Sequence, residues 1–199
     1  TRLKQEWGIP PDRQVVVYLG LLAEYQGTSL LLEAAARVVS ARPNTHFLIM
    51  GYPGVEHYQL QAGRLGLDRH ITFTGRIPYQ DAPRYLGLGD ISVAPKLSAT
   101  EGSGKLLNYM SMALPVVAFD TPVSREYLQD LGVYAPPADI QGLAAALITL
   151  LDDPGRATAL GQSLRQRVIE RYSWEWAGRQ ILDVYDRALA SPPLLSHWD

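Results

Sequence analysis

Two of the three lysines in this chain lie close together, on either side of a short glycine-containing segment. Lys96 and Lys105 flank Glu101, and Asn108 follows three residues after the second lysine. Ammonium groups and the N–H groups at a helix start bind phosphate, whereas carboxylate and amide groups hydrogen-bond the hydroxyl groups of a sugar or a ribose. Residues of these types at this spacing therefore indicate a phosphorylated sugar as the ligand.

The segment between these lysines connects two apolar runs. Residues 91–95 and 116–118 are mostly apolar, as expected for buried strands, and a helix is predicted between them at 105–112. Open α/β sheets bind ligands at loops that leave the carboxyl end of a strand. We therefore expect the polar residues of this loop to lie at the carboxyl edge of a parallel sheet.

Strand-like and helix-like segments alternate over the rest of the chain. Further strands are predicted at 15–19, 46–50, 71–74 and 132–135. Helices are predicted at 2–7, 29–40, 55–65, 79–88, 123–131, 140–151, 155–172 and 173–190. This alternation is typical of βαβ units, so the predicted fold class is α/β: a Rossmann-like, doubly wound, mainly parallel six-stranded sheet with helices on both faces and a C-terminal run of helices. Trp174 and Trp176, in the last helix, are predicted to pack in the core or in an interface.

Three of the predicted strands end directly in a glycine, at Gly20, Gly51 and Gly75. A glycine there lets the chain turn sharply and lets backbone N–H groups approach a ligand, but each could equally be an ordinary turn residue. Neither G-x-G-x-x-G nor G-x-x-x-x-G-K-[ST] accompanies them, which weakens a dinucleotide-binding or P-loop interpretation.

Composition limits the class of protein. The chain has 199 residues, a formal net charge of −2 and 47% hydrophobic residues, which fits a globular protein and gives no support to nucleic-acid binding. It has no cysteine, so disulfides and thiolate ligands are excluded and a cytoplasmic location is expected. No apolar run approaches the ~18 residues of a transmembrane segment. Because the chain starts at Thr1 without resembling a signal peptide, we expect a processed protein or a piece of a longer one.

Other catalytic patterns are missing from the sequence. The four histidines are dispersed, without the spacing of a metal site, so no metal is expected. There is no G-x-S-x-G elbow to indicate a serine hydrolase. Carboxylates follow several predicted strands, but a glycosidase needs two of them at a defined separation, which the sequence does not reveal.

Several segments, in order, resemble one family. Residues 20–27 stand where that family has G-R-L-x-x-x-K-G, and residues 89–95 resemble its A-D-V-x-x-x-P strand. Residues 106–117 resemble L-x-E-x-M-A-x-G-x-P-V-V, and residues 172–176 resemble the F-S-W-E that opens its last helix. Over residues 15–190 the chain resembles the C-terminal, nucleotide-sugar-binding domain of GT-B glycosyltransferases of family 4.

This resemblance implies an activity and a set of site residues. It implies a domain at 1–190, one half of a GT-B fold, followed by an irregular tail at 191–199. Its function would be to bind a nucleotide-diphosphate sugar, as donor substrate rather than cofactor, for retaining, metal-independent transfer. The acceptor-side base would come from a missing N-terminal domain, so the isolated chain should bind donor weakly and transfer nothing. Glu101 is the expected catalytic residue. The expected donor-binding residues are Gly20, Tyr25, Gln26, Arg76, Ile77, Lys96, Gly102, Ser103, Gly104, Lys105, Leu106 and Asn108.

The chain also departs from the family pattern. The family's arginine and lysine that bind the donor diphosphate fall at Leu21 and Gln26, which are uncharged. The second glutamate of its E-x7-E pair falls at Asn108, and the first falls at Thr100, or at Glu101 with a shift of one residue. A neutral amide binds ribose hydroxyls less strongly than a carboxylate does.

Two interpretations of these departures stay open. In the first, Lys96 and Lys105 replace the missing basic pair and the domain serves an enzyme; otherwise both are ordinary surface lysines. In the second, the chain is a non-catalytic GT-B-like module that binds a nucleotide or a partner. An α/β dehydrogenase is a third possibility, but the sequence lacks its glycine fingerprint and an acidic residue for the ribose after the second strand.

Overall fold

The computed structural model describes residues 2–98 and 100–190 of the chain, and six strands form one sheet in the order β3-β2-β1-β4-β5-β6. The strands are β1 (Gln14–Leu19), β2 (Thr45–Met50), β3 (Ile71–Phe73), β4 (Ile91–Ala94), β5 (Val116–Phe119) and β6 (Val133–Ala135). All five pairs of neighbouring strands are parallel, which confirms the predicted α/β sheet. The chain runs outward from β1 to one edge and then returns to β4, so the direction of winding reverses between β1 and β4.

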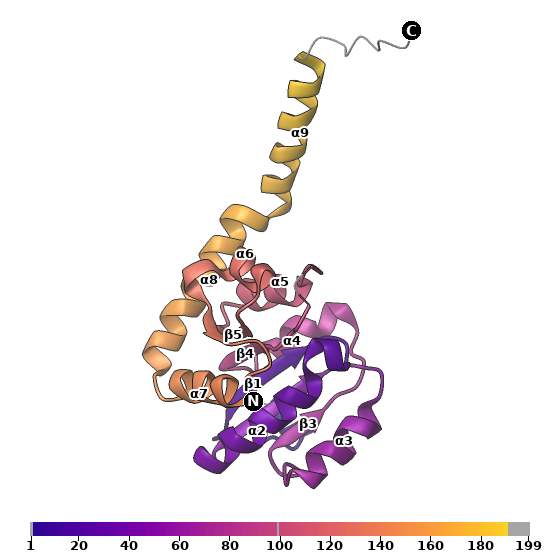
Figure 1. Cartoon of the computed structure of the whole chain (residues 1–199), viewed down its shortest axis with the longest axis vertical. Coiled ribbons are helices and arrows are strands. Elements are labelled where there is room, and N and C mark those ends of the chain that lie inside the picture. Colours follow the sequence, from indigo (N-terminus) through magenta and orange to yellow (C-terminus); the bar gives the residue numbers. More distant parts are fainter. Residues whose placement is uncertain (1, 99, 191–199) are drawn as a thin grey trace.

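Helices follow each strand (Figure 1). They are α1 (Arg2–Glu6), α2 (Thr28–Ala41), α3 (Val55–Arg64), α4 (Ala82–Leu86), α5 (Gly104–Ser111), α6 (Pro122–Leu128), α7 (Ile140–Leu151), α8 (Pro154–Tyr172) and α9 (Trp174–Ala190). Single 3-10 turns occur at η1 (Glu24–Gln26), η2 (Tyr79–Asp81) and η3 (Gln129–Leu131).

Two helices are shorter than the sequence predicted. The segment 79–88 divides into η2 and α4, because Pro83 is compatible only with the first turn of an α-helix. The segment 123–131 divides into α6 and η3 at Gln129, whose φ of 48° interrupts the right-handed helix.

The core consists of two layers of side chains, one on each face of the sheet. Successive residues of a strand point to opposite faces, so Val16 and Tyr18 pack with α2, α3 and α7, whereas Val15 and Val17 pack with α4, α5, α6 and α8. Both faces of β1 and β2 are therefore buried. This explains the uninterrupted apolar runs from which these strands were predicted.

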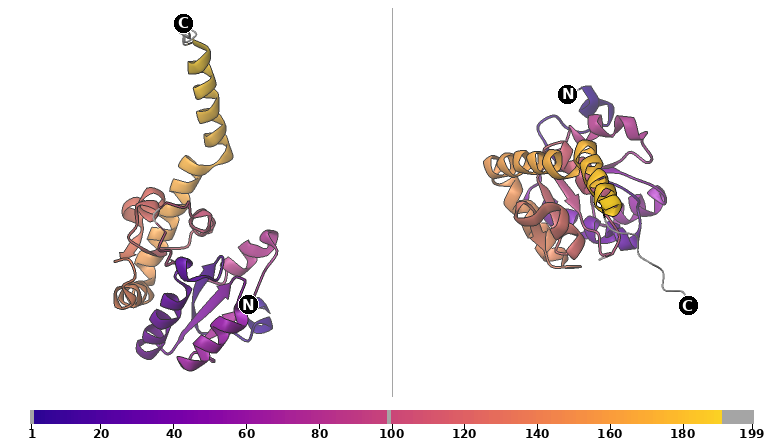
Figure 2. Two further views of the ribbon diagram at one scale, coloured as in Figure 1. Left: turned by 45° about the vertical axis from the view of Figure 1, so that its right-hand side comes forward. Right: turned by 90° about the horizontal axis from the view of Figure 1, so that it is seen from above.

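Helix α9 projects away from the body of the domain (Figures 1 and 2). No residue of α9 is buried, and Trp174 is 90% exposed, so it does not pack in the core, and its packing in an interface stays a prediction; Trp176 is partly buried. The chain turns at Ser173 with an extended backbone, which directs the new helix outward instead of along the sheet. The predicted tail at 191–199 lies outside the described residues.

Candidate functional site

Strands β1 and β4 separate toward their carboxyl ends. They are in register only at Val16 and Val17 of β1, and beyond this point the hydroxyl group of Tyr109 in α5 lies between them. This hydroxyl accepts the N–H of Leu19 at 2.8 Å and donates to the carbonyl of Val93 at 3.3 Å. The place where the winding reverses is therefore open, which is the usual position of a ligand in this kind of sheet.

Two neighbouring cavities open at this carboxyl edge. The first, which we call the α5 cavity, has a volume of about 270 Å³ and is lined by Leu19, Gly20, Leu21, Gln26, Tyr79, Lys96, Gly102, Ser103, Gly104, Lys105 and Asn108. The second, which we call the β3 cavity, has a volume of about 540 Å³ and lies over the ends of β1, β2 and β3. Its walls include Met50, Gly51, Tyr52, Gly75, Arg76, Ile77 and Pro78. The two cavities share Leu19, Gly20, Leu21 and Tyr79, so they form one continuous depression.

Most of the predicted site residues line this depression. The α5 cavity contains Gly20, Gln26, Lys96, Gly102, Ser103, Gly104, Lys105 and Asn108, and the β3 cavity contains Arg76 and Ile77. Tyr25, Glu101 and Leu106 line neither cavity. Leu106 is 1% exposed and its side chain packs in the core, so only its backbone could serve a ligand. Tyr25 is exposed, and Glu101 stands in an ion pair next to the α5 cavity.

The glycines at the strand ends do different things. Gly20 has a φ of +150°, which favours glycine, and a Cβ there would lie 2.8 Å from Lys105 Nζ and displace the end of that side chain. A Cβ on Gly51 would lie 2.2 Å from the carbonyl oxygen of Gly20. Gly75 has a φ of +69° but no neighbour within 4 Å of its Cβ position, so its backbone turn favours glycine.

The loop after β1 packs directly against the loop after β4. A Cβ on Gly27 would lie 1.9 Å from the carbonyl oxygen of Pro95, and the N–H of Leu97 donates to the carbonyl of Tyr25 at 3.1 Å. These backbone contacts hold Gln26 and Lys96 beside one another at the same cavity, although they are far apart in the sequence.

The ammonium group of Lys96 is bound by residues of its own loop. Its Nζ lies 2.8 Å from Glu101 Oε2 and donates to the backbone carbonyls of Glu101 at 3.1 Å and Gly102 at 3.0 Å. The Lys96 side chain is 8% exposed, whereas that of Glu101 is 61% exposed. The lysine is therefore the buried support of the loop, and the carboxylate is its solvent-facing partner.

Lys105 has no acidic partner among the described residues. It lies in the first turn of α5, and its Nζ donates to Gln26 Oε1 at 2.9 Å and to the Tyr18 hydroxyl at 3.1 Å. The same Nζ lies 4.2 Å from the centre of the Tyr18 ring. Desolvation lowers the pKa of Lys105 to about 7, and the nearby charge of Lys96 acts in the same direction. Near neutral pH its ammonium form is thus in equilibrium with the free amine.

Two side chains that the sequence did not single out also shape the depression. The Tyr79 hydroxyl donates to Asn108 Oδ1 at 3.1 Å, and Tyr79 lines both cavities. The Arg76 guanidinium lies 5.1 Å from the centre of the Tyr52 ring. The only sequence signal for the two tyrosines was their position shortly after a predicted strand.

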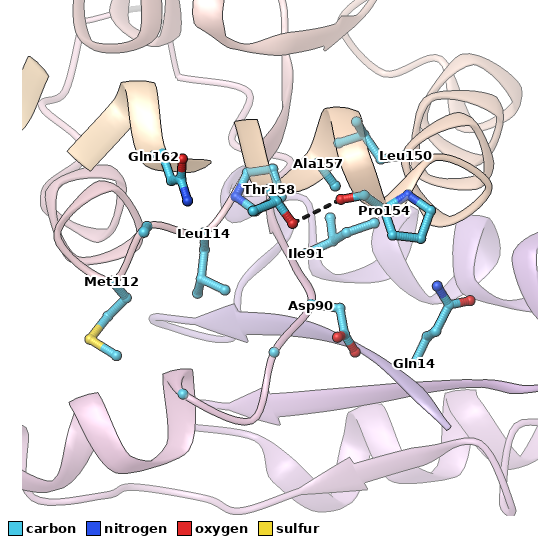
Figure 3. Close-up of a pocket in the computed structure, with 14 residues that line it drawn as sticks. Gln14, Asp90, Ile91, Met112, Leu114, Leu150, Pro154, Ala157, Thr158 and Gln162 are labelled. Carbon is cyan, nitrogen blue, oxygen red and sulfur yellow. Dashed lines mark hydrogen bonds between the residues drawn. The ribbon is translucent and has the colours of Figure 1, made fainter. Parts of the chain in front are cut away.

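A further cavity lies at the opposite, amino-terminal edge of the sheet (Figure 3). Its volume is about 340 Å³, and Figure 3 shows side chains from β1, β4 and α8 around it. Three of its polar side chains are engaged internally: Asp90 Oδ2 accepts the N–H of Val15 at 2.7 Å, Gln14 donates to the carbonyl of Leu151, and Thr158 donates to the carbonyl of Pro154. It contains no cationic side chain and offers a phosphorylated ligand little.

Within residues 2–98 and 100–190, no three His, Cys, Asp or Glu side chains gather as a possible metal site. In the same ranges no helix has the length and apolar character needed to span a membrane.

The fold defines a Rossmann-like α/β domain with a depression at the carboxyl edge of its sheet. The chain belongs to the group 1 glycosyltransferases: the profile described as "Glycosyl transferases group 1" matches residues 13–153. This confirms the family that the sequence motifs indicated.

Curated relatives align with almost the whole of this chain, and each of them is about twice as long. An alpha-D-kanosaminyltransferase of Streptomyces kanamyceticus is 28% identical over 186 residues, which cover 92% of this chain and 48% of that protein. A GDP-mannose-dependent alpha-(1-6)-phosphatidylinositol monomannoside mannosyltransferase of Mycolicibacterium smegmatis is 28% identical over 194 residues, or 92% of this chain and 50% of that protein. The chain thus spans about half the length of the curated relatives it matches.

Solved structures share the fold. A glycosyltransferase from Rickettsia africae superimposes with a TM-score of 0.86 at 17% identity, over 96% of this chain and 52% of that one. Anabaena HepE, solved in complex with UDP, gives 0.84 at 20% identity, over 94% and 52%. The C-terminal domain of LpcC from Francisella tularensis, a group 1 protein solved as a separate domain, gives 0.74 at 23% identity, over 87% and 92%.

Proposed function

We propose that this chain is the donor-binding half of a retaining glycosyltransferase, and that a nucleotide-diphosphate sugar occupies the depression formed by the α5 and β3 cavities. The observation that carries the proposal is a lysine and a helix start facing one cavity where the winding of the sheet reverses, with a larger cavity directly beside it. The relative that uses GDP-mannose and the structural neighbour solved with UDP support a donor of this class.

The two cavities suit different parts of such a donor. The β3 cavity, with the Tyr52 ring beside Arg76 and with Ile77 and Pro78 in its wall, is large enough for a base. The α5 cavity, with Lys105 and the start of α5, suits the diphosphate. Asn108, held by Tyr79, would bond the ribose, and the exposed Glu101 carboxylate would bond the transferred sugar.

The chemistry of this half would be positional and electrostatic. When the bond between the anomeric carbon and the diphosphate breaks, negative charge grows on the leaving diphosphate, and cationic and N–H groups fixed around it stabilise that charge. Glu101 would orient the sugar, and the family resemblance implies that this happens with retention and without a metal ion. The cytoplasmic location stays a prediction of the sequence.

A second domain would complete the enzyme. The chain spans about half of its relatives, and α9 carries an apolar face of Ile181, Leu182, Tyr185 and Leu189 that nothing among the described residues covers. A face of this kind is typical of an interface. We infer that an N-terminal, acceptor-binding domain covers it and supplies the acceptor-side groups, so the isolated chain should bind donor but transfer no sugar.

One observation favours a different function. The basic pair and the ribose-binding glutamate of the family are replaced by Leu21, Gln26 and Asn108, each of which weakens donor binding. A non-catalytic GT-B-like module, which binds a nucleotide or a partner for another subunit, is therefore the alternative.

A calorimetric titration of the 199-residue chain against UDP-, GDP- and ADP-sugars tests the proposal. Binding of one nucleotide series, with the nucleoside diphosphate much stronger than the nucleoside, is the expected result. Absence of binding to all three series would overturn the donor-domain proposal. Sugar transfer by the longer protein, lost in Glu101→Gln with donor binding retained, would separate the enzyme from the binding module.

A further inference from the structure

We infer that Lys105 alone supplies the positive charge for the donor's diphosphate at this site, in place of basic side chains at positions 21 and 26, and that Lys96 does not share this role. The inference deepens the proposed function and rests on it. It follows from three features of the α5 cavity: the partners of the two lysines, the environment of the Lys105 ammonium, and the start of α5.

The two lysines differ in what they already bind. Lys96 is neutralised by Glu101 at 2.8 Å, and its remaining hydrogens are directed to the backbone carbonyls of Glu101 and Gly102. Using Lys96 for a phosphate would break the contacts that shape its loop. Lys105 contacts only the neutral acceptors of Gln26 and Tyr18, so its charge is still available to an anion.

The position of Lys105 is unfavourable for a cation when no anion is present. Its side chain lies at the amino-terminal start of α5, where the helix dipole repels positive charge, and it is partly shielded from water by Gly20 and the Tyr18 ring. A bound diphosphate would remove this penalty. Its negative charge would pair with the ammonium and also meet the N–H groups of the first helical turn.

Ser103 provides an independent sign of a ligand. It is the N-cap residue of α5 and lines the α5 cavity, yet its hydroxyl makes no capping hydrogen bond. The Ser103 side chain is 5% exposed, and its Oγ has no hydrogen-bond partner among the described residues. Buried hydroxyl groups are usually satisfied, so an unpaired one in the wall of a cavity indicates a missing partner.

If Lys105 binds the diphosphate, the protein should take up a proton on binding. A site whose lysine is already fully charged would take up none. The ionisable groups that contact Lys105 or shift its pKa are Tyr18 from β1 and Lys96 from the loop after β4. Burial raises the pKa of Tyr18, so this phenol stays neutral. Lys105, with its pKa lowered to about 7, is the group that would gain a proton when a diphosphate binds near neutral pH.

The test is calorimetric titration of the chain with UDP, GDP, uridine and guanosine, at pH 6.5 and 8.5 and in buffers of low and high ionisation enthalpy. For the diphosphate that the wild type binds, Lys105→Met should lower affinity about tenfold and abolish proton uptake, with the nucleoside unaffected. Lys4→Met is the matched control, because Lys4 lies at the opposite end of β1 and donates to Pro11 and Arg13. Lys4→Met should leave both the diphosphate affinity and the proton uptake unchanged.

A second variant tests the site without altering the lysine. Gln26→Glu keeps the size of the side chain and places a carboxylate beside Lys105 Nζ. It should keep Lys105 protonated, compete with the diphosphate, and so weaken binding without proton uptake. Equal diphosphate affinities of the wild type and Lys105→Met would overturn the inference and leave the donor proposal standing. Failure of the wild type to bind either diphosphate would overturn both.

Discussion

Lys105 Nζ lies 2.9 Å from Gln26 Oε1, although the two residues belong to different loops and are 79 positions apart. Gln26 is the position at which the family pattern has a lysine. In this chain the ammonium group therefore occupies the neighbourhood of that position but comes from α5 instead of η1.

The loop between Lys96 and Lys105 should depend on Lys96 for its shape. Lys96→Met removes one ion pair and two bonds to backbone carbonyls from a side chain that is almost fully buried. We expect the free energy of unfolding to fall by about 1–3 kcal/mol. Urea denaturation measures this. Glu101→Gln, which changes only the exposed partner, should alter stability by less than 1 kcal/mol. An equal loss in both variants would show that Lys96 does not support the loop in this way.

Gly20 should tolerate no side chain. Its φ of +150° is in a region that favours glycine, so Gly20→Ala should lower stability by about 1–3 kcal/mol, and its Cβ would displace the end of the Lys105 side chain and so weaken diphosphate binding. Gly104→Ala is the matched control in the same cavity, since its Cβ would meet nothing within 4 Å and it has helical geometry. Its stability should be unchanged or raised by up to about 1 kcal/mol. Thermal unfolding of the two variants gives the comparison.

Stability should fall with pH between about 6.5 and 4 because of His46. This histidine is 3% exposed, and desolvation lowers its pKa to about 4, assisted by the charges of Arg13, His70 and Lys4. Between pH 6.5 and 4, His46 therefore binds a proton in the unfolded chain but not in the folded chain. The contribution of His46 is fully present above pH 6.5 and is lost as pH falls toward 4, by up to about 3 kcal/mol.

The measurement is urea denaturation at pH 7.5 and pH 4.5. Carboxylates also titrate in this range, so the quantity of interest is the difference between the wild type and His46→Gln. The variant should lose less stability than the wild type between the two pH values. His57→Gln, in an exposed position of α3, should behave as the wild type. If the wild type, His46→Gln and His57→Gln lost stability equally between the two pH values, His46 would not be the source of the pH dependence.

Ala113 should be replaceable by glycine with a gain in stability. It has a φ of 54°, and it stands where the family pattern has a glycine. A left-handed conformation costs a non-glycine residue about 1–2 kcal/mol, and part of this gain is offset by the greater freedom of glycine in the unfolded chain. We expect Ala113→Gly to raise the free energy of unfolding by about 0.5–1 kcal/mol in urea denaturation. A lower stability would mean that the methyl group contributes packing that outweighs the strain.

The sequence alone determined the parallel α/β sheet, the family and most of the residues that line the depression at the carboxyl edge. It could do so because uninterrupted apolar runs, helical periodicity and strand-end glycines are local consequences of burial on both faces of the sheet. Strands that are parallel must deliver their following loops to the same edge, so Gly20, Arg76 and Lys105 could be assigned to one region before any contact was known.

Only the tertiary structure decided what each of these residues binds. Lys96 and Lys105 are equivalent in the sequence, but one is paired with Glu101 and the other with Gln26 and Tyr18, because partners separated by many residues depend on how two loops pack. The same holds for Trp174, whose exposure follows from the direction in which α9 leaves the domain. The periodicity of apolar residues predicts which face of α9 is apolar. The backbone geometry at Ser173 determines whether that face contacts the core.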